Sequence, residues 1–596
     1  MRKALVLFSL LVAAILSTAL VSPPGLSPGV SNAVSCFRAE APLFAQECVA
    51  LRSAIATLDG RDPHSIRLAR QKLAACRSSY KRMESFLEYF FRTAVRIYNR
   101  APKFEAEEPD MEYQSPLGLQ VIESLLYEKI TPDSRQQLLD QAAAVAGSSA
   151  DLPALLYDFQ ADDRQLLESL RIELVRILAL DITGYEAPFL RTGITESYEA
   201  LQSIDRQLQP YLIRGEPVSD SLRYFMGKSL AALQEGKTNS PAPSGVAHPA
   251  FDSFDRLQFL RSAALPLQHQ LSLLIRKRGL WLHTNPILNY DTKDLFSPDA
   301  LIPESFPHTG ASDAATIALG RTLFFTKGLS GNGNRSCAFC HAPEKFFTDG
   351  QPTSLAIDGH SRLDRNAPSL LYCGMQYQQF WDGRAATLEQ QIRTVLKNPR
   401  EMAATDSVIQ HIDTISQAIA AYVRSLHPLN SAFDKYLEGS GPSLSVREIN
   451  GANLFLGKAQ CATCHFIPLF NGLIPPDYAR TEYEVLGTTR TDRLEKPQLS
   501  MDSGRYAVYP FAFYRGAFKT PTVRNAAKTA PYMHNGAFHN LEKVLDFYNK
   551  GGGEGLGLSM PSQTLSAHPL GLSRREEQDI ILFLSTLTDS LSSIAK

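Results

Sequence analysis

The sequence carries little net charge, and this limits the classes of partner that need to be considered. Its 60 lysines and arginines nearly balance its 61 aspartates and glutamates, which gives a formal charge of −1 over 596 residues. This balance does not favour nucleic acid or a strongly acidic partner, although a local patch would not show in the total. The composition is ordinary for a soluble globular protein, with 44% hydrophobic and 20% charged residues. At roughly 150 residues per domain, the length predicts about three or four domains.

Long apolar runs are also scarce, and the single clear one lies at the N-terminus. Arg2 and Lys3 precede an apolar stretch over residues 4–21, and small and helix-breaking residues follow from Ser22 to Gly25. A basic start, an apolar run and small residues are typical of a secretory signal. We therefore expect residues 1–25 to be a signal peptide and the mature protein to be periplasmic. The alternative is an uncleaved anchor helix, the one case in which the chain would contact the membrane.

Only eight cysteines are present. Four belong to the two motifs described below, and Cys36, Cys48, Cys76 and Cys373 remain. Export would permit a disulfide among the first three of these residues. Three cysteines cannot all pair with one another, so one of them would be left over.

The N-terminal half lacks the alternating pattern of β-strands and favours helices instead. Apolar residues recur at helical spacing, and residues 65–98 are nearly free of glycine and proline. Helices are expected at Ser65–Tyr98, Leu117–Lys129, Asp163–Leu180, Glu196–Leu212 and Phe254–Gly279. Residues 236–245 are rich in helix breakers and predict an exposed loop. The pattern predicts an all-helical bundle over residues 36–285.

A linker rich in proline and glycine is expected at residues 286–311, and the chain beyond it repeats itself. Gly320-Arg321-Thr322-Leu323-Phe324 resembles Gly451-Ala452-Asn453-Leu454-Phe455, and two similar apolar helices close the units. In the second unit, capping boxes are expected from Ser445 to Glu448 and from Ser573 to Glu576. The duplication predicts two similar domains, at residues 312–438 and 439–596. The fold class is therefore mainly α, with an N-terminal bundle followed by these two domains.

Each unit contains one Cys-x-x-Cys-His motif. These are Cys337-Ala338-Phe339-Cys340-His341 and Cys461-Ala462-Thr463-Cys464-His465. A c-type haem needs two thiols for its vinyl groups and an adjacent histidine for its iron. A zinc site would need four ligands, whereas each motif offers three. The sequence thus predicts two covalently bound haems, with His341 and His465 as proximal iron ligands. The two repeated domains are therefore expected to be cytochrome c-like haem domains.

The flanking sequence resembles the bacterial di-haem cytochrome c peroxidase family, which includes the MauG group. The similarity covers about residues 312–590. It is carried by Phe346–Gly350, Arg365–Leu370, Phe380–Leu388, Asn398–Met402, Lys519–Asn525 and Thr529–Gly536. The resemblance implies that peroxide binds at the first haem. It also implies that Glu401 is the distal acid–base residue, able to move a proton between the two peroxide oxygens. Gln391 would then hydrogen-bond peroxide.

The resemblance assigns further roles between the two haems. Trp381, one of only two tryptophans, matches a residue that relays electrons from one haem to the other. Its alternative role is core packing. Asn366 and Thr520 match positions around a calcium ion, for which oxygen donors are suited. His360 lies near a removable sixth ligand of some relatives, but its surroundings match poorly, and a surface-loop position is the alternative.

The second haem departs from the common peroxidase pattern. Many relatives supply a methionine from the helix that here starts after Asn540 and stops at Gly551, and the matching residue is Tyr548. Helical spacing puts Leu541, Val544, Leu545 and Tyr548 on one face. The MauG group also has tyrosine at this place. Tyrosine would favour higher iron oxidation states, whereas Met533 is the competing ligand and core packing is the other alternative.

The N-terminal half offers one weaker resemblance. Gly118-Leu119-Gln120-Val121-Ile122-Glu123 resembles the Gly-x-His-x-x-Glu motif of imelysin-like helical domains, which are exported and associated with iron uptake. Gln120 stands where the motif has histidine, so a metal role would be weakened. A helical docking or packing domain is the alternative.

Three functions follow from these patterns. The first is a di-haem peroxidase that reduces hydrogen peroxide to water with electrons from a small c-type cytochrome or cupredoxin. The second is a MauG-like oxidase that modifies a partner protein, which Tyr548 favours. The third is a non-catalytic electron-transfer cytochrome, against which Glu401 and Gln391 argue. No nucleic-acid partner is expected.

Overall fold

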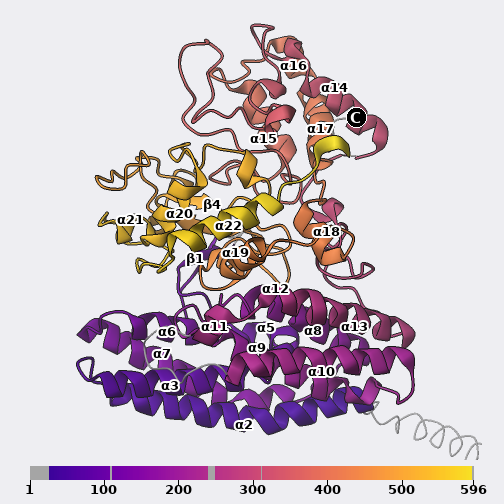
Figure 1. Cartoon of the computed structure of the whole chain (residues 1–596), viewed down its shortest axis with the longest axis vertical. Helices are drawn as coiled ribbons and strands as arrows, with labels where there is room; N and C mark the ends of the chain where they lie inside the picture. The colour runs from indigo at the N-terminus through magenta and orange to yellow at the C-terminus, as the bar shows by residue number, and fades with distance from the viewer. Residues whose placement is uncertain (1–25, 108–110, 239–248, 311, 594–596) are drawn as a thin grey trace, which may run out of the picture.

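The structure is a computed structural model that describes residues 26–107, 111–238, 249–310 and 312–593. The expected signal peptide lies outside these residues. The described chain is mainly helical, as the sequence predicted. Within it, no helix combines the length and the apolar character that crossing a bilayer requires. The helices of the N-terminal half form one end of the molecule, the segment with α18–α22 lies above them, and the segment with α14–α17 forms the far end (Figure 1).

The N-terminal helices begin earlier than the predicted boundary at residue 36. Their bounds are α2 Pro28–Ala56, α3 Pro63–Lys81, α4 Glu84–Phe90, α5 Arg92–Val95, α6 Leu119–Tyr127, α7 Pro132–Ala150, α8 Asp163–Arg176, α9 Gly193–Leu208, α10 Pro217–Thr238, α11 Pro249–Ser253, α12 Arg256–Phe259 and α13 Leu265–Lys277. The Ser27 side chain caps α2 by accepting from the Val30 amide, and Pro28 occupies the first turn. A start at residue 36 is therefore wrong, because this cap lies upstream.

The single helix expected over residues 65–98 is also wrong, because the chain forms α3, α4 and α5 there. The interruptions fall at Met83 and at Phe91, whose backbone (φ −132°, ψ 45°) is not helical. Neither break contains glycine or proline, so the local sequence carries no stop signal. Tertiary packing sets these bends: they let Lys81 and Glu84 both point into the protein interior, where each is at most 1% exposed.

The prediction of an all-helical N-terminal half also missed a small hairpin. Strands β1 (Glu105–Glu107) and β2 (Glu112–Gln114) pair antiparallel, with Ala106 opposite Tyr113. The hairpin stands away from the helical layer and reaches the segment with α19 and α22 (Figure 1). It therefore brings residues of the N-terminal half to the second motif.

Of the expected loop over 236–245, residues 236–238 still belong to α10 and the rest lies outside the described residues.

The expected linker contains little regular structure, but it is packed rather than exposed. Buried apolar side chains follow one another along it: Ile287, Leu288, Tyr290, Leu295, Phe296, Leu301 and Phe306. Phe296 packs edge-on against Phe433 of α18, with ring centroids 5.9 Å apart. These contacts fix the path of the chain between its two halves.

The remaining helices repeat one arrangement twice. Their bounds are α14 Ala314–Phe324, α15 Leu388–Lys397, α16 Asp406–Gln410, α17 Ile412–Arg424, α18 Ala432–Glu438, α19 Val446–Leu456, α20 Leu541–Asn549, α21 Gly552–Gly555 and α22 Arg574–Thr586. Strands β3 (Tyr483–Val485) and β4 (Ala517–Lys519) pair antiparallel. The capping boxes expected at Ser445 and Ser573 are both confirmed.

The two matching glycines explain why the repeat has the same crossing in each copy. α14 packs on α17 and α19 packs on α22. A Cβ atom at Gly320 would lie 1.8 Å from the Ala418 carbonyl oxygen, and one at Gly451 would lie 1.9 Å from that of Asp579. Glycine is therefore required at both crossings, because each pair of helices approaches backbone to backbone.

Candidate haem-binding cavity

The two Cys-x-x-Cys-His motifs lie at equivalent places in the repeat. Each begins on a single 3₁₀ turn, Cys337–Phe339 in the first copy and Cys461–Thr463 in the second. In each turn the histidine amide donates to the carbonyl of the first cysteine, at 3.0 Å in both copies. The turn therefore holds the two thiols and the imidazole on one short stretch of chain, as covalent haem attachment requires.

The two histidines have matching hydrogen bonds. The Nδ1 of His341 donates to the Phe347 carbonyl at 3.1 Å, and that of His465 donates to the Pro521 carbonyl at 3.0 Å. A carbonyl oxygen can only accept, so the bond fixes the tautomer and leaves Nε2 free for iron. Burial lowers the pKa of His341, and it lowers that of His465 to about 4. Both imidazoles are thus kept neutral, which is the form that binds a metal.

Both motifs open into one continuous cavity of about 1700 Å³. Pockets for single small ligands are usually ~300–1000 Å³, so this cavity exceeds the space that one such ligand needs. All four motif cysteines and both histidines are at its wall. The donor set, the fixed tautomers and the size of the cavity fit two covalently attached haems.

Glu401 and Gln391 line the same cavity, and Glu401 lies near enough to Cys340 of the first motif to help raise the pKa of its thiol. Gln391 is carried by α15, and Glu401 follows in the turn after it, where its amide donates to the Asn398 carbonyl at 3.1 Å. Burial raises the pKa of Glu401, while Arg384, Asn398 and Arg400 act to lower it. A carboxyl group with a raised pKa beside an open cavity can both take and return a proton.

Trp381 joins the two residues that the resemblance assigns to calcium. Its indole Nε1 donates to the Asn366 carbonyl at 2.9 Å, and its own carbonyl accepts from the Lys519 amide, next to Thr520, at 2.8 Å. The Thr520 hydroxyl is buried without a hydrogen-bond partner. The Asn366 side-chain nitrogen donates to the carbonyls of Gln351 and Pro352. These three expected site residues thus lie together at the cavity wall.

The helix expected after Asn540 is confirmed as α20, whose N-cap is the Asn540 side chain. Its predicted inward face is also confirmed, because the four residues that share it all line the cavity: Leu541, Val544, Leu545 and Tyr548. Burial raises the pKa of the Tyr548 hydroxyl, with Cys464 and Cys461 near enough to contribute. Met533 lines the cavity as well.

His360 is exposed in a loop, where its amide donates to Asp358.

The sequence did not predict that the N-terminal half would help to enclose the second motif. Lys103, just before β1, forms ion pairs with Glu482 and, at 3.5 Å, with Glu484. The Cys464 thiol in turn contacts Glu484 at 3.6 Å. Tyr185 packs edge-on against Phe466, with centroids 5.4 Å apart. No motif marks these residues, because the contacts depend on how the two halves pack.

The short motif over residues 118–123 has its two polar residues buried in α6. Gln120 donates to the Asn99 carbonyl at 3.3 Å and lines the cavity. One Glu123 oxygen accepts from the amides of Phe189 and Leu190, both at 2.8 Å. In this position Glu123 holds the loop that follows residue 181. The imelysin-like character of this half stays a prediction.

Among the remaining cysteines, the Cys48 and Cys76 sulfurs lie 3.2 Å apart.

The chain is similar to known proteins over about half of its length. A family model described as di-haem cytochrome c peroxidase matches residues 314–414. The chain is 31% identical over 322 residues to the cytochrome-c peroxidase IdrP2 of Denitromonas iodatirespirans, covering 48% of this chain and 84% of that protein. It is also 31% identical over 310 residues to the methylamine utilization protein MauG of Methylorubrum extorquens, covering 48% and 82%. A crystal structure of a MauG-like protein associated with microbial copper homeostasis is 30% identical, with a TM-score of 0.41 and coverage of 48% and 92%.

Proposed function

Because the chain belongs to the di-haem cytochrome c peroxidase family, which implies an oxidoreductase with two c-type haems, we propose that it reduces hydrogen peroxide to water. Electrons would come from a small c-type cytochrome or cupredoxin, and the protein would act in the periplasm after removal of residues 1–25. The observation that carries the proposal is the single cavity that both motifs share with Glu401, Gln391 and Trp381.

The residues of the chain divide the chemistry between them. When bound, the haems supply the iron that coordinates peroxide and the two electrons that its reduction needs. Glu401 takes a proton from the peroxide oxygen nearer the metal and returns it to the leaving oxygen. Gln391 orients the peroxide by a hydrogen bond. Trp381 lines the same cavity as both motifs, with its indole held by the Asn366 carbonyl, and would serve as the electron relay.

A calcium ion near Asn366 and Thr520 is part of the same proposal. The support for it is the buried Thr520 hydroxyl, which has no hydrogen-bond partner in the described structure. Oxygen donors of this kind suit calcium. Chelation should then lower turnover without releasing the covalently attached haems.

The decisive test of the peroxidase proposal is Glu401→Gln in the holoprotein. We expect peroxide turnover to fall by about 10²–10⁴-fold, the range typical for loss of a general acid–base group. Haem content and reduction by dithionite should stay unchanged. The matched control is Glu438→Gln at the exposed end of α18. If Glu401→Gln turned peroxide over at the wild-type rate, Glu401 would not be the acid–base residue. If the wild type itself reduced no peroxide, the chain would be an electron carrier and not a peroxidase.

A second function, a MauG-like oxidation of a partner protein, is favoured by Tyr548, whose ring lines the cavity close to Cys461 and Cys464. An anionic tyrosine ligand would favour oxidised iron. Optical and EPR spectra before and after one equivalent of peroxide separate the two functions. A long-lived oxidised state that Tyr548→Phe abolishes supports the oxidase, whereas a methionine-ligation band and fast turnover after half-reduction support the peroxidase.

A further inference from the structure

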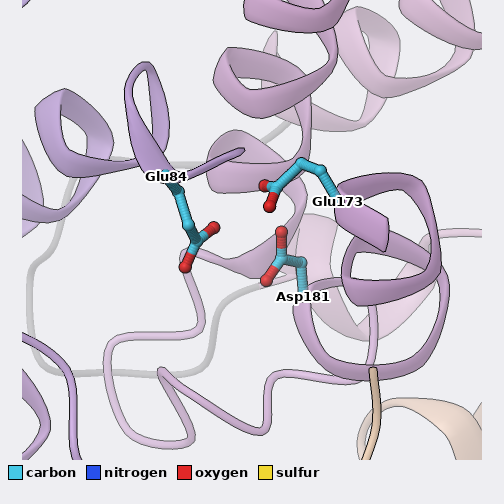
Figure 2. A group of neighbouring side chains, drawn as sticks. All are labelled: Glu84, Glu173 and Asp181. Atoms are coloured by element: carbon cyan, nitrogen blue, oxygen red, sulfur yellow. The ribbon is translucent and has the colours of Figure 1, made fainter. Parts of the chain in front are cut away.

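Three carboxylates that none of the functions above uses meet in the interior of the N-terminal half. Glu84 comes from α4, Glu173 from α8, and Asp181 from the π-helical turn Ile177–Asp181 that continues α8. The three are 0%, 1% and 2% exposed. One oxygen from each lies within 4.8 Å of the others. Their carboxyl groups point toward one another from three directions (Figure 2).

Each carboxylate has one oxygen that accepts a hydrogen bond and one that accepts none. Lys81 donates to Glu84 at 2.7 Å and to Asp181 at 2.8 Å, while Arg176 donates to Glu173 at 3.2 Å. The second oxygens, Glu84 Oε1, Glu173 Oε1 and Asp181 Oδ2, are buried and accept no hydrogen bond. A buried acceptor without a partner is costly, and native structures contain few of them. Three such atoms in one place indicate a missing ligand.

The neighbouring cations cannot supply it. The Lys81 ammonium has three donors, and its third goes to Glu186 at 2.7 Å. Arg77 is already paired with Glu196 through two bonds of 2.8 Å and lies 3.7 Å from Glu186. The Arg176 Nε donates to Glu173 and lies 4.0 Å from Glu84 Oε1, which is too far for a hydrogen bond.

The charges do not balance either. Five buried carboxylates, the three above with Glu186 and Glu196, face three cations, Lys81, Arg77 and Arg176, which leaves an excess of two negative charges. Buried charges must be neutralised or paired.

We propose that Glu84, Glu173 and Asp181 bind one divalent cation through the three oxygens that accept no hydrogen bond. Ligands made only of carboxylate oxygen suit magnesium, calcium or manganese rather than zinc or copper. Opposite oxygens around a calcium ion, each at 2.3–2.6 Å, are roughly 5 Å apart, so the 4.8 Å spread of the cluster fits such an ion.

The position of the site suggests what the ion does. Asp181 begins the segment that leads to Tyr185 and Phe189, both of which line the cavity beside the second motif. Tyr185 packs on Phe466, directly after His465. The ion therefore ties the wall of the second motif to α4 and α8. The site is independent of the proposed peroxidase function, because none of its ligands reaches the cavity.

The test measures bound metal in the full-length holoprotein. Protein produced in medium supplemented with MnCl₂ is dialysed against EDTA, and manganese is measured against haem iron by mass spectrometry. We compare the wild type with Glu173→Gln and Asp181→Asn, which keep the shape of the side chains. The matched control is Glu199→Gln, a mostly buried carboxylate of the same half whose two oxygens pair with Arg82 and Lys237.

We expect the wild type and Glu199→Gln to retain one more manganese ion per chain than the other two variants. Manganese held elsewhere, for example at a calcium site between the motifs, is common to all four proteins and cancels. If an amide variant fails to accumulate, Glu173→Asp replaces it. Aspartate is one methylene shorter than glutamate, so its carboxylate no longer reaches the same position.

Protons are the rival occupant, because burial raises the pKa of both Glu173 and Asp181. Equal manganese content in the folded wild type and the variants, or no manganese in the wild type, would assign the cluster to protons and overturn the proposal.

Discussion

Lys103 and Glu482 form a largely buried ion pair that joins the two halves of the chain beside the second motif. The Lys103 side chain is 18% exposed and that of Glu482 only 4%. Removing one partner of a buried pair usually costs about 3–5 kcal/mol, because the other charge is left uncompensated. We therefore expect Lys103→Met to destabilise the protein by an amount in this range.

The same variant should also change the second haem. Loss of a positive charge beside a redox centre favours its oxidised form, so one of the two midpoint potentials should become more negative. Spectroelectrochemistry of the holoprotein measures both potentials. The matched control is Arg92→Gln, because Arg92 also bridges the two halves, to Asp477, but at 3.8 Å and with side chains 62% and 44% exposed. If both variants changed the midpoint potentials by the same amount, the charge of Lys103 would not act specifically on the second haem.

Trp381 gives a second prediction, which separates electron relay from core packing. Trp381→Phe keeps an aromatic ring but removes the indole N–H that bonds the Asn366 carbonyl. We expect electron transfer between the haems to slow by roughly tenfold or more, which corresponds to ~1.4 kcal/mol in the barrier. The rate of this electron transfer is measured by rapidly mixing half-reduced protein with peroxide.

The chain supplies its own control for this experiment. Trp281, the second of the two tryptophans, lies next to Tyr290 in the linker region, with ring centroids 6.1 Å apart. Trp281→Phe should leave the transfer rate unchanged. If Trp381→Phe had normal transfer and lowered stability only, the packing role would be correct.

The comparison of sequence and structure shows which signals are local. The haem motifs, the capping boxes at Ser445 and Ser573 and the inward face of α20 were predictable, because each depends on residues a few positions apart. The bends at Met83 and Phe91 were not, since no breaker marks them and the burial of Lys81 with its carboxylate partners fixes them. The Lys103 contact was equally hidden, because it joins residues 379 positions apart.

Glu401 predicts the pH dependence of peroxide turnover. Burial raises the pKa of this carboxyl group above its ordinary value, and the base form exists only above that pKa. We therefore expect kcat/KM for peroxide to fall on the acid side, with a midpoint higher than the 4.5 of an ordinary glutamate. Steady-state kinetics across pH measure this limb. It should disappear in Glu401→Gln and persist in Glu438→Gln, and a limb that survives in Glu401→Gln would belong to another group.

Glu123 predicts how the stability of the N-terminal half changes with pH. Burial raises its pKa to about 7 from an ordinary value of 4.5. The folded state thus prefers the protonated form. The stabilisation is complete below the unfolded pKa and is lost as pH rises from about 4.5 to about 7, by roughly 3 kcal/mol at 1.36 kcal/mol per unit.

The Glu123→Gln variant should remove this loss, because glutamine is neutral at every pH. Its side-chain oxygen can still accept from the Phe189 and Leu190 amides, as the carboxylate does. Urea unfolding followed by circular dichroism at pH 5 and pH 8 measures the difference, with Glu128→Gln at the exposed end of α6 as the control. We expect the wild type and the control to lose stability over this interval more steeply than Glu123→Gln. Equal slopes in all three proteins would show that Glu123 is ionised in the folded state and that its charge is balanced by Arg77.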